Sequence, residues 1–425
     1  MKRIYFFIVC LLLQVTAKQE RALEGEKVNS LRMLPRLNLF GNVTISGISS
    51  GADAAVQFHV ANSDIINGSA IFAGQAYGCA VHRFATEPQF GCLNQSYDRR
   101  GPGCDGMPWG PAPCYDCDGG PNSQTVTYDH CKIPNFPQLT QIDVLLKYAR
   151  DLEANGDIPP LSYLEDDSVY LYRGTKDDVY VDGSVNNTLA FFQALNISSF
   201  HFEAAVPSAH CWPSTAISPD EGKCGGSFTL QNCGYDGAGA ALQFLYGGSL
   251  IIPSNISYLI PNNLIMFYQF HYSLDTPWAG QGKQGYVYIP SYCNNGPCRL
   301  HVALHGCGMS ASNPSMGMNF VYFTGLNAWA EANNLVILYP QMGGFIDYNI
   351  TAPAAQLEAA CFDGYGQSGV DYASTSGPQM LSIRNMISAL YGGNDAFYNA
   401  GLTNLFSPKV RGPDIYEDRP DRITI

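Results

Sequence analysis

The sequence predicts an α/β protein built on a doubly wound, mostly parallel sheet. Short apolar runs rich in β-branched residues recur along the chain, and helix-like stretches lie between them. Alternation of strands with helices is typical of a parallel sheet that is covered by helices. The apolar runs do not alternate strictly with polar residues, which indicates strands that are buried on both faces.

The individual elements follow from these runs in chain order. We expect strands at 42–48, 68–74, 167–174, 201–206, 285–290, 299–306 and 334–340. We expect helices at 51–63, 138–156, 187–195, 237–248, 325–334 and 377–393. The length is compatible with one decorated α/β domain over 18–425, and the last residues, 406–425, lack apolar periodicity and predict a loose tail.

The N-terminus predicts export. Lys2 and Arg3 precede an apolar core at 4–13, and small residues up to Ala17 are typical of a signal-peptide cleavage site. The apolar core is too short to span a membrane. We therefore expect a signal peptide over 1–17 and a secreted, extracellular mature protein.

Composition agrees with that compartment and excludes some partners. The chain has 14 cysteines, and 13 remain without Cys10 of the signal, which predicts disulfides with one thiol left over. Its net charge of −13 becomes −15 once Lys2 and Arg3 are removed, so nucleic acid and anionic membranes are poor partners. We expect a monomer. Seven asparagines begin N-x-S/T sequons, the first of them Asn42. The other six are the candidate glycosylation sites: Asn67, Asn94, Asn186, Asn196, Asn255 and Asn349.

One segment interrupts the alternation of strands and helices. Residues 96–136 are rich in Gly, Pro, Cys and Asp, which predicts an insertion held by disulfides. The sequence CYDC at 114–117 has the C-x-x-C spacing that also occurs in zinc and redox sites. Because no second C-x-x-C and no histidine pair accompany it, a structural disulfide in an exported protein is favoured over a metal or redox role.

The sequence GISSG at 47–51 is the candidate nucleophile motif. G-x-S-x-G alone is a weak signal, but here an apolar strand precedes it and a helix follows it. That strand–turn–helix context is what a nucleophile elbow requires, with Ser49 lifted above the sheet. An ordinary serine in a packing turn is the less favoured alternative.

A serine nucleophile needs a base and an acid that orients the base. In this fold class the acid and then the base follow the serine along the chain. Asp177 comes just after the strand at 167–174, at the edge where such sheets bind ligands, whereas the adjacent Asp178 reads as a solvated loop charge. His210 follows the strand at 201–206 in a loop. These residues are the candidate acid and base.

The oxyanion formed by attack needs fixed N–H donors. One should be the backbone N–H of Ser50, directly after the nucleophile. The sequence LHVALHGCG at 300–308 predicts a strand that ends in a turn, and the N–H of Cys307 is the second candidate. This turn normally precedes the nucleophile in the chain, so its late position predicts a circularly permuted fold.

At this point the sequence resembles a known family, the secreted polyhydroxybutyrate depolymerases of the circularly permuted, single-domain α/β-hydrolase type. The matching blocks are long and cover most of the mature chain. They lie at 44–80, 232–247, 298–307, 327–341 and 376–390. The resemblance implies Ser49, Asp177 and His210 as the triad and the N–H groups of Ser50 and Cys307 as the oxyanion hole.

The resemblance also implies a set of disulfides, which spacing alone cannot give. The implied pairs are Cys79–Cys92, Cys224–Cys233, Cys293–Cys298 and Cys307–Cys361. The cysteines left over are Cys104, Cys114, Cys117, Cys131 and Cys211. Cys211, beside the candidate base, is a possible partner for the insertion at 96–136.

Two departures from the family affect the expected substrate. The family has a tryptophan-rich stretch after the cysteine that matches Cys361, and here Phe362 and Tyr365 stand in CFDGYGQSG as the candidate cleft residues. The insertion at 96–136 is also longer than expected. We therefore expect a serine esterase without metal or cofactor that acts on short-chain hydroxyalkanoate polyesters or their oligomers. The alternatives are an esterase for feruloyl, acetyl or other small esters, and an inactive secreted binding protein on the same scaffold.

Overall fold

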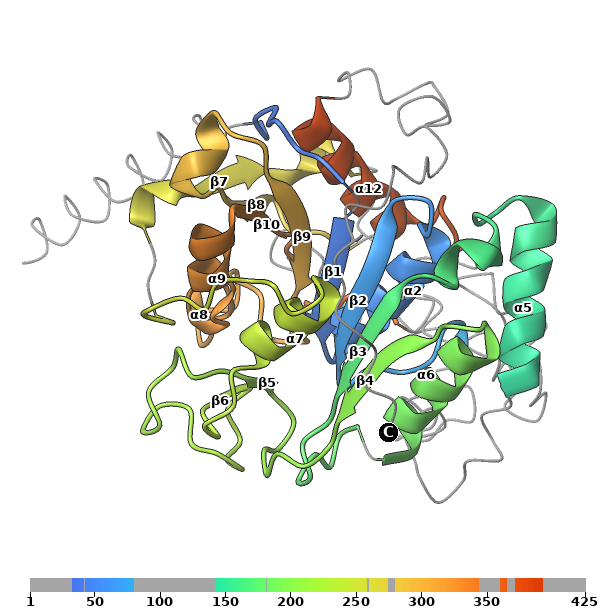
Figure 1. Cartoon of the computed structure of the whole chain (residues 1–425), viewed down its shortest axis with the longest axis horizontal. Helices are drawn as coiled ribbons and strands as arrows, with labels where there is room; N and C mark the ends of the chain where they lie inside the picture. The colour runs from blue at the N-terminus through green and yellow to red at the C-terminus, as the bar shows by residue number, and fades with distance from the viewer. Residues whose placement is uncertain are drawn as a thin grey trace, which may run out of the picture.

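The computed structural model describes residues 33–41, 43–79, 142–180, 182–257, 260–273, 280–343, 360–364 and 371–392. At its centre is an eight-stranded sheet with helices on both faces (Figure 1). In chain order its strands are β1 (Val43–Ile48), β2 (Ile66–Phe72), β3 (Ser168–Tyr172), β4 (Ser199–Glu203), β7 (Leu264–Tyr268), β8 (Gln284–Tyr288), β9 (Arg299–Leu304) and β10 (Leu335–Tyr339).

The strand order is β4-β3-β2-β1-β9-β10-β8-β7. The six strands from β4 to β10 run parallel, and β8 and β7 complete the sheet with antiparallel pairings. Strands from late in the chain therefore lie directly beside β1, the first strand. The predicted circular permutation stays a prediction, and this strand order is compatible with it. The same order brings the carboxyl ends of β1, β3, β4 and β9 to one edge.

Helices from different parts of the chain cover the two faces. α2 (Ser50–Ala61) packs on β1 and β2, with α5 (Ile142–Asn155), α6 (Asp182–Ala194) and α12 (Pro378–Tyr391) on the same face. The other face is covered by α7 (Gly237–Leu245), α8 (Asn319–Phe323) and α9 (Leu326–Asn333). A second sheet consists of the two-residue strands β5 (Trp212–Pro213) and β6 (Leu230–Gln231).

Strands β1, β2, β3, β9 and β10, inside the sheet, divide their side chains between two hydrophobic cores. On β3, Val169 and Leu171 belong to the core under α2, whereas Tyr170 and Tyr172 belong to the core under α7. The same alternation of faces separates Ile71 from Phe72 on β2. Both faces are buried, which explains why the strands read as continuous apolar runs.

The predicted fold class is confirmed, with small differences at the ends of elements. β7 was not predicted, because its sequence LIMFY continues into the aromatic stretch QFHY and no turn residue marks its C-terminal end. It joins the sheet antiparallel to β8 at an edge. The insertion at 96–136, the signal peptide at 1–17 and the tail at 406–425 lie outside the described residues, so these predictions stand as they were made.

Candidate active site

Ser49 occupies a strained turn between β1 and α2. Its φ angle is +57°, a left-handed conformation that is rare for a residue other than glycine. A Cβ on Gly47 would lie 2.1 Å from the carbonyl oxygen of Gly51, and a Cβ on Gly51 would lie 2.3 Å from that of His305. Both glycines of GISSG are therefore needed for the turn to form, which is the geometry of a nucleophile elbow.

The predicted acid and base are in contact. His210 Nδ1 lies 2.9 Å from Asp177 Oδ2, at the carboxyl edge of the sheet that also carries Ser49. The other carboxylate oxygen, Oδ1, accepts hydrogen bonds from the backbone N–H groups of Val179 and Tyr180 at 2.9 and 2.8 Å. The Asp177 side chain is buried, whereas the His210 side chain is 15 % exposed. The carboxylate is thus fully bonded and orients the imidazole through Nδ1.

Backbone hydrogen bonds join the loop that carries the acid to the loop that carries the base. Thr175 N–H donates to Val206 C=O at 2.8 Å, and Lys176 N–H donates to Ser208 C=O at 3.0 Å. Arg173 is buried below the acid loop and donates to the carbonyl oxygens of Asp177 and Tyr180. The relative position of Asp177 and His210 is therefore set by the backbone as well as by their own hydrogen bond.

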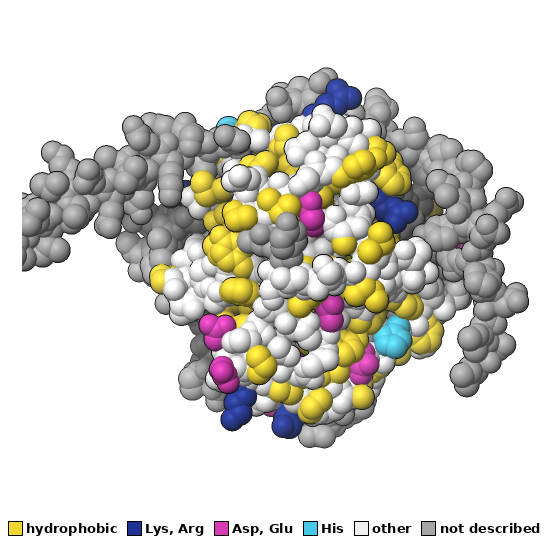
Figure 2. All heavy atoms as spheres, turned by 60° about the vertical axis from the view of Figure 1, so that its left-hand side comes forward, with side chains coloured by type: hydrophobic (Ala, Val, Ile, Leu, Met, Phe, Trp, Pro, Cys, Tyr) yellow, Lys and Arg dark blue, Asp and Glu magenta, His cyan; other side chains and the backbone are white. Residues whose placement is uncertain are grey.

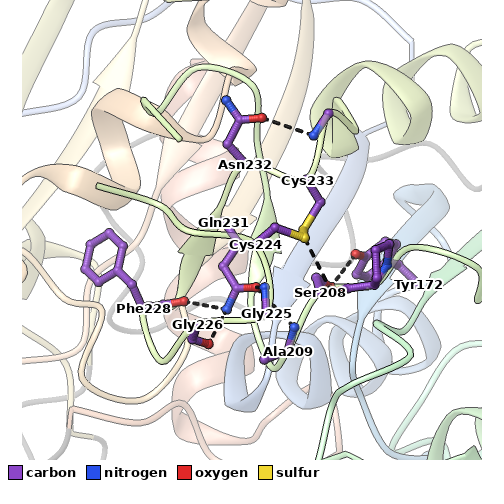
Figure 3. Close-up of a disulfide and its surroundings, with 12 residues drawn as sticks. Tyr172, Ser208, Ala209, Cys224, Gly225, Gly226, Phe228, Gln231, Asn232 and Cys233 are labelled. Carbon is purple, nitrogen blue, oxygen red and sulfur yellow. Dashed lines mark hydrogen bonds between the residues drawn. A yellow bond between two sulfur atoms is a disulfide. The ribbon is translucent and has the colours of Figure 1, made fainter. Parts of the chain in front are cut away.

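A buried glutamine fixes the other side of the base loop (Figure 3). Gln231 Oε1 accepts from the N–H groups of Ala209 and Gly225, and its Nε2 donates to the carbonyls of Gly226 and Phe228. The Gln231 side chain uses four hydrogen bonds and connects the residue before His210 to the loop closed by the Cys224–Cys233 disulfide. Such a satisfied buried network is expected to be rigid.

The turn after β9 lies against Ser49, the candidate nucleophile. A Cβ on Gly306 would lie 3.1 Å from the Cβ of Ser49, so the peptide between Gly306 and Cys307 is next to the reacting side chain. Cys307 forms a disulfide with Cys361, and the N–H of Phe362 donates to Ser50 Oγ at 3.2 Å. Two segments distant in sequence thus hold this turn against the start of α2.

His305 fixes the orientation of the same turn. Its Nε2 accepts from the N–H of Met342 at 3.0 Å, so its proton must be on Nδ1, which donates to the carbonyl oxygen of Gly306 at 2.8 Å. Burial lowers the pKa of His305 to about 4, so the ring stays neutral. The carbonyl of Gly306 and the N–H of Cys307 share one peptide plane and point in opposite directions. Holding the carbonyl therefore aims the N–H.

The expected cleft role of Phe362 is not what the structure shows. Its side chain is fully buried, and its ring lies 5.0 Å from that of His305. Phe362 supports the turn after β9 from below instead of presenting an aromatic surface to a substrate. Tyr365, the second expected cleft residue, lies outside the described residues.

Three of the four disulfides that the resemblance implies are present: Cys224–Cys233, Cys293–Cys298 and Cys307–Cys361. Cys79 is also disulfide-bonded, but Cys92 lies outside the described residues, and that pairing stays a prediction. Cys211 is a free, buried thiol, so its suggested link to the insertion is wrong. Burial raises its pKa to about 12, which keeps it a protonated, inert neighbour of His210.

Some of the predicted glycosylation sites lie within the described residues, and others lie outside them. Four of the asparagines in glycosylation sequons are exposed: Asn67, Asn186, Asn196 and Asn255. Asn94, Asn349 and the CYDC sequence lie outside the described residues. Within the described ranges, no group of three His, Cys, Asp or Glu residues could hold a metal ion, and no helix is long and apolar enough to cross a membrane.

Sequence reasoning missed the residues that support the candidate triad. Gln231 and Arg173 contact the loops that carry Asp177 and His210, from positions that no motif marks. Tyr180 follows Asp177 by three residues, beyond the strand expected at 167–174, and no motif marks it. Asp53, in the first turn of α2, looks like an ordinary helix-start carboxylate. Only the spacing from Asp177 or Ser49 could have drawn attention to them, and spacing alone does not distinguish them from their neighbours.

The chain is similar in sequence to known depolymerases. No family model matches the chain. It is 29% identical over 374 residues to a polyhydroxybutyrate depolymerase of Talaromyces funiculosus, with 85% of this chain and 93% of the relative covered. It is 28% identical over 358 residues to a poly(3-hydroxybutyrate) depolymerase of Delftia acidovorans. That match covers 82% of this chain and 60% of the relative.

Solved structures give the same result. A PHB depolymerase from Penicillium funiculosum matches with a TM-score of 0.62, and a PHB depolymerase with a serine-to-alanine change, complexed with an R3HB trimer, matches with 0.63. Each is 26% identical to this chain, and each match covers 85% of this chain and 99% of the other. The chain is thus a relative of the polyhydroxybutyrate depolymerases in both sequence and fold.

Proposed function

We propose that this chain is a secreted serine esterase that hydrolyses the ester bonds of polyhydroxybutyrate or its oligomers. The observation that carries the proposal is the hydrogen bond between the buried Asp177 and His210, at the sheet edge where Ser49 stands in its elbow. The names of the relatives supply the substrate class. The predicted signal peptide and the exposed sequons support a secreted glycoprotein.

In the proposed mechanism, His210 acts as the base. Its Nε2 takes the proton from Ser49 Oγ as the oxygen attacks an ester carbonyl, and a tetrahedral oxyanion forms. The N–H groups of Ser50 and Cys307 stabilise that charge. His210 then donates its proton to the departing alcohol, which leaves an acyl group on Ser49. Water, activated by the same histidine, releases the hydroxy acid.

Asp177 has a separate role in this scheme. Its carboxylate accepts the Nδ1 proton of His210, which leaves Nε2 free to receive the proton of the serine. When His210 becomes an imidazolium, the buried carboxylate balances the new charge. No step of this scheme needs a metal or a cofactor.

One face of the molecule carries few charged side chains. On the face in Figure 2, apolar side chains lie among uncharged polar groups, and charged side chains are few. The charged residues make up only 14% of the sequence. Contact between such a face and a polyester surface would require little desolvation of charge. This supports a polymeric ester over a charged substrate.

The test compares secreted wild type with Ser49→Ala on a polyhydroxybutyrate suspension and on a panel of short acyl, acetyl and feruloyl esters. We expect only the wild type to clear the suspension. Activity that is confined to the small esters would keep the mechanism and move the substrate to the alternative class. Equal activity of the two proteins, or none from a folded wild type, would overturn the triad and favour the binding-protein alternative.

A further inference from the structure

We propose that Tyr180 is a positioning residue. It fixes the position of the base His210 relative to α2, the helix that begins directly after Ser49. This inference rests on the proposed function and concerns a residue that belongs to neither the triad nor the oxyanion hole. Tyr180 follows the acid loop and is completely buried. Its backbone, its ring and its hydroxyl each contact a different part of the catalytic site.

The backbone of Tyr180 belongs to the acid. Its N–H donates to Asp177 Oδ1 at 2.8 Å, and its carbonyl accepts from Arg173 Nε at 3.0 Å. The start of the Tyr180 side chain is therefore fixed relative to the carboxylate that orients His210. A side chain that begins from so rigid a point can transmit position to what it touches.

The ring of Tyr180 belongs to the base. It lies parallel to the imidazole of His210, with 8° between the planes and 5.3 Å between the centroids. Asp177 holds one edge of the imidazole, and the tyrosine face limits rotation about that hydrogen bond. When His210 gains a proton during catalysis, the electron-rich ring face also favours the positive charge.

The hydroxyl of Tyr180 belongs to the nucleophile's helix. It donates to Asp53 Oδ2 at 2.6 Å, and both side chains are fully buried. Asp53 lies in the first turn of α2, and its N–H donates to the carbonyl oxygen of Ser49 at 2.9 Å. Its other oxygen, Oδ1, accepts from the N–H of Gln75 at 2.9 Å, which fixes the carboxylate.

These contacts form a continuous path from the base to the nucleophile. The path runs from His210 through the ring and hydroxyl of Tyr180 to Asp53 and then to Ser49. Proton transfer depends steeply on the distance and angle between the serine oxygen and the imidazole. Tyr180 is thus placed to affect the activation of Ser49 and not the binding of the substrate.

The test uses two substitutions at Tyr180. Tyr180→Phe removes the hydroxyl and should lower kcat and the rate of Ser49 labelling by a fluorophosphonate about tenfold, the effect of one lost hydrogen bond. Tyr180→Leu also removes the flat ring and should lower both about a hundredfold. KM for soluble hydroxybutyrate oligomers should change little in either variant, because neither removes a substrate contact.

Tyr339→Phe is the matched control. Tyr339 is also fully buried, and its hydroxyl donates to Asn327 Oδ1 at 2.9 Å, on β10 and away from the triad contacts. This variant should lose a similar amount of thermal stability and keep the labelling rate of the wild type. A Tyr180→Phe protein that labels at the wild-type rate would overturn the proposal, as would equal rate losses at the two tyrosines.

A double-mutant cycle with Asp53→Ala isolates the hydrogen bond. If both residues act through it, the loss in the double variant should be clearly smaller than the product of the two single losses. Losses that multiply would contradict the path. Labelling reports Ser49 activation for any ester substrate, so a wild type that labels but leaves the polymer intact would sink the polyester and not Tyr180. A wild type that does not label would overturn both.

Discussion

The two sides of Ser49 are built in different ways. On the base side, the loops after β3 and β4 carry a buried carboxylate and an imidazole, joined by side-chain and backbone hydrogen bonds. On the oxyanion side, the turn after β9 carries no charge. It is held by the neutral His305, by the Cys307–Cys361 disulfide and by the packing of Phe362.

The difference follows from what each side does in the proposed mechanism. The base side must accept a positive charge in each catalytic cycle, so a carboxylate with fixed partners is useful there. The oxyanion side must present a fixed dipole to a transient negative charge, and a mobile or ionised group would weaken it. Ser49 therefore lies between a base side that is held by a charged group and an oxyanion side that is held by neutral groups.

The largest expected effect comes from the base side. Asp177→Asn keeps the size of the side chain but turns an acceptor of the Nδ1 proton into a donor or a neutral acceptor. We expect kcat on hydroxybutyrate oligomers to fall about 10⁴-fold, as for the equivalent change in a serine protease triad. Asp178→Asn, at the adjacent exposed position, is the control and should keep its activity. Similar losses in both variants would argue against the assignment of Asp177.

Substitution of His305 should have a smaller effect on kcat. Two different substitutions separate the roles of its two ring nitrogens. Asn places an N–H near the position of the histidine Nδ1, whereas Gln reaches the position of Nε2. His305→Asn should therefore keep the hydrogen bond to Gly306 and most of kcat. His305→Gln should lose that bond and about 10- to 100-fold in kcat, because the Cys307 N–H is no longer aimed.

The measurement for these variants is steady-state kinetics together with inhibition by a phosphonate that mimics the tetrahedral intermediate. His301→Gln is the control, since His301 is a buried histidine on the same strand that bonds Thr44 and Ser46 instead of the turn. Its stability should fall while kcat stays near that of the wild type. Equal kcat for His305→Asn and His305→Gln would contradict a specific role for the Gly306 bond.

A separate effect, on acid stability instead of activity, is expected on the oxyanion side. Burial lowers the pKa of His301 to about 3 and of His305 to about 4, from an ordinary value of 6.5. Below pH 6.5 the unfolded chain binds protons that these folded histidines do not. The unfolding free energy should therefore fall as the pH drops from 6.5 towards 4, by at most about 1.4 kcal/mol per pH unit for each histidine.

Urea unfolding of wild type and His301→Gln at several pH values checks this expectation. The variant should show a shallower loss of stability between pH 6.5 and 4, because one buried neutral histidine has been removed. Parallel curves for the two proteins would mean that His301 is protonated in the folded state or partly ordered in the unfolded one. Either explanation would contradict the expectation that only the unfolded state protonates His301 in this pH range.

The sequence predicts the fold well because most strands are apolar runs and most long helices lie between two such runs. The triad candidates could also be named, since Ser49, Asp177 and His210 each follow a strand in the order that the fold class expects. The turn at 305–307 was recognised from its strand and glycine. Each of these patterns lies within a short segment, so it can be recognised in a single sequence.

The supporting contacts could not be predicted, because they join residues far apart in the chain. The bond from Tyr180 to Asp53 spans 127 positions, and that from Phe362 to Ser50 spans 312. Phe362 was expected in the cleft because the family resemblance places aromatic residues after the cysteine that matches Cys361, but its side chain is fully buried in the core. β7 was missed because pairing with β8, and not its own pattern, makes it a strand.

The most direct test of the central claim is to trap the acyl-enzyme. Wild-type protein is mixed with a hydroxybutyrate oligomer, quenched in acid within the first turnover, digested and analysed by mass spectrometry. The account predicts a hydroxybutyryl or oligomeric adduct on the peptide that contains Ser49, and no adduct in Ser49→Ala. Turnover of the ester without an adduct on Ser49, or with an adduct on another residue, would contradict it.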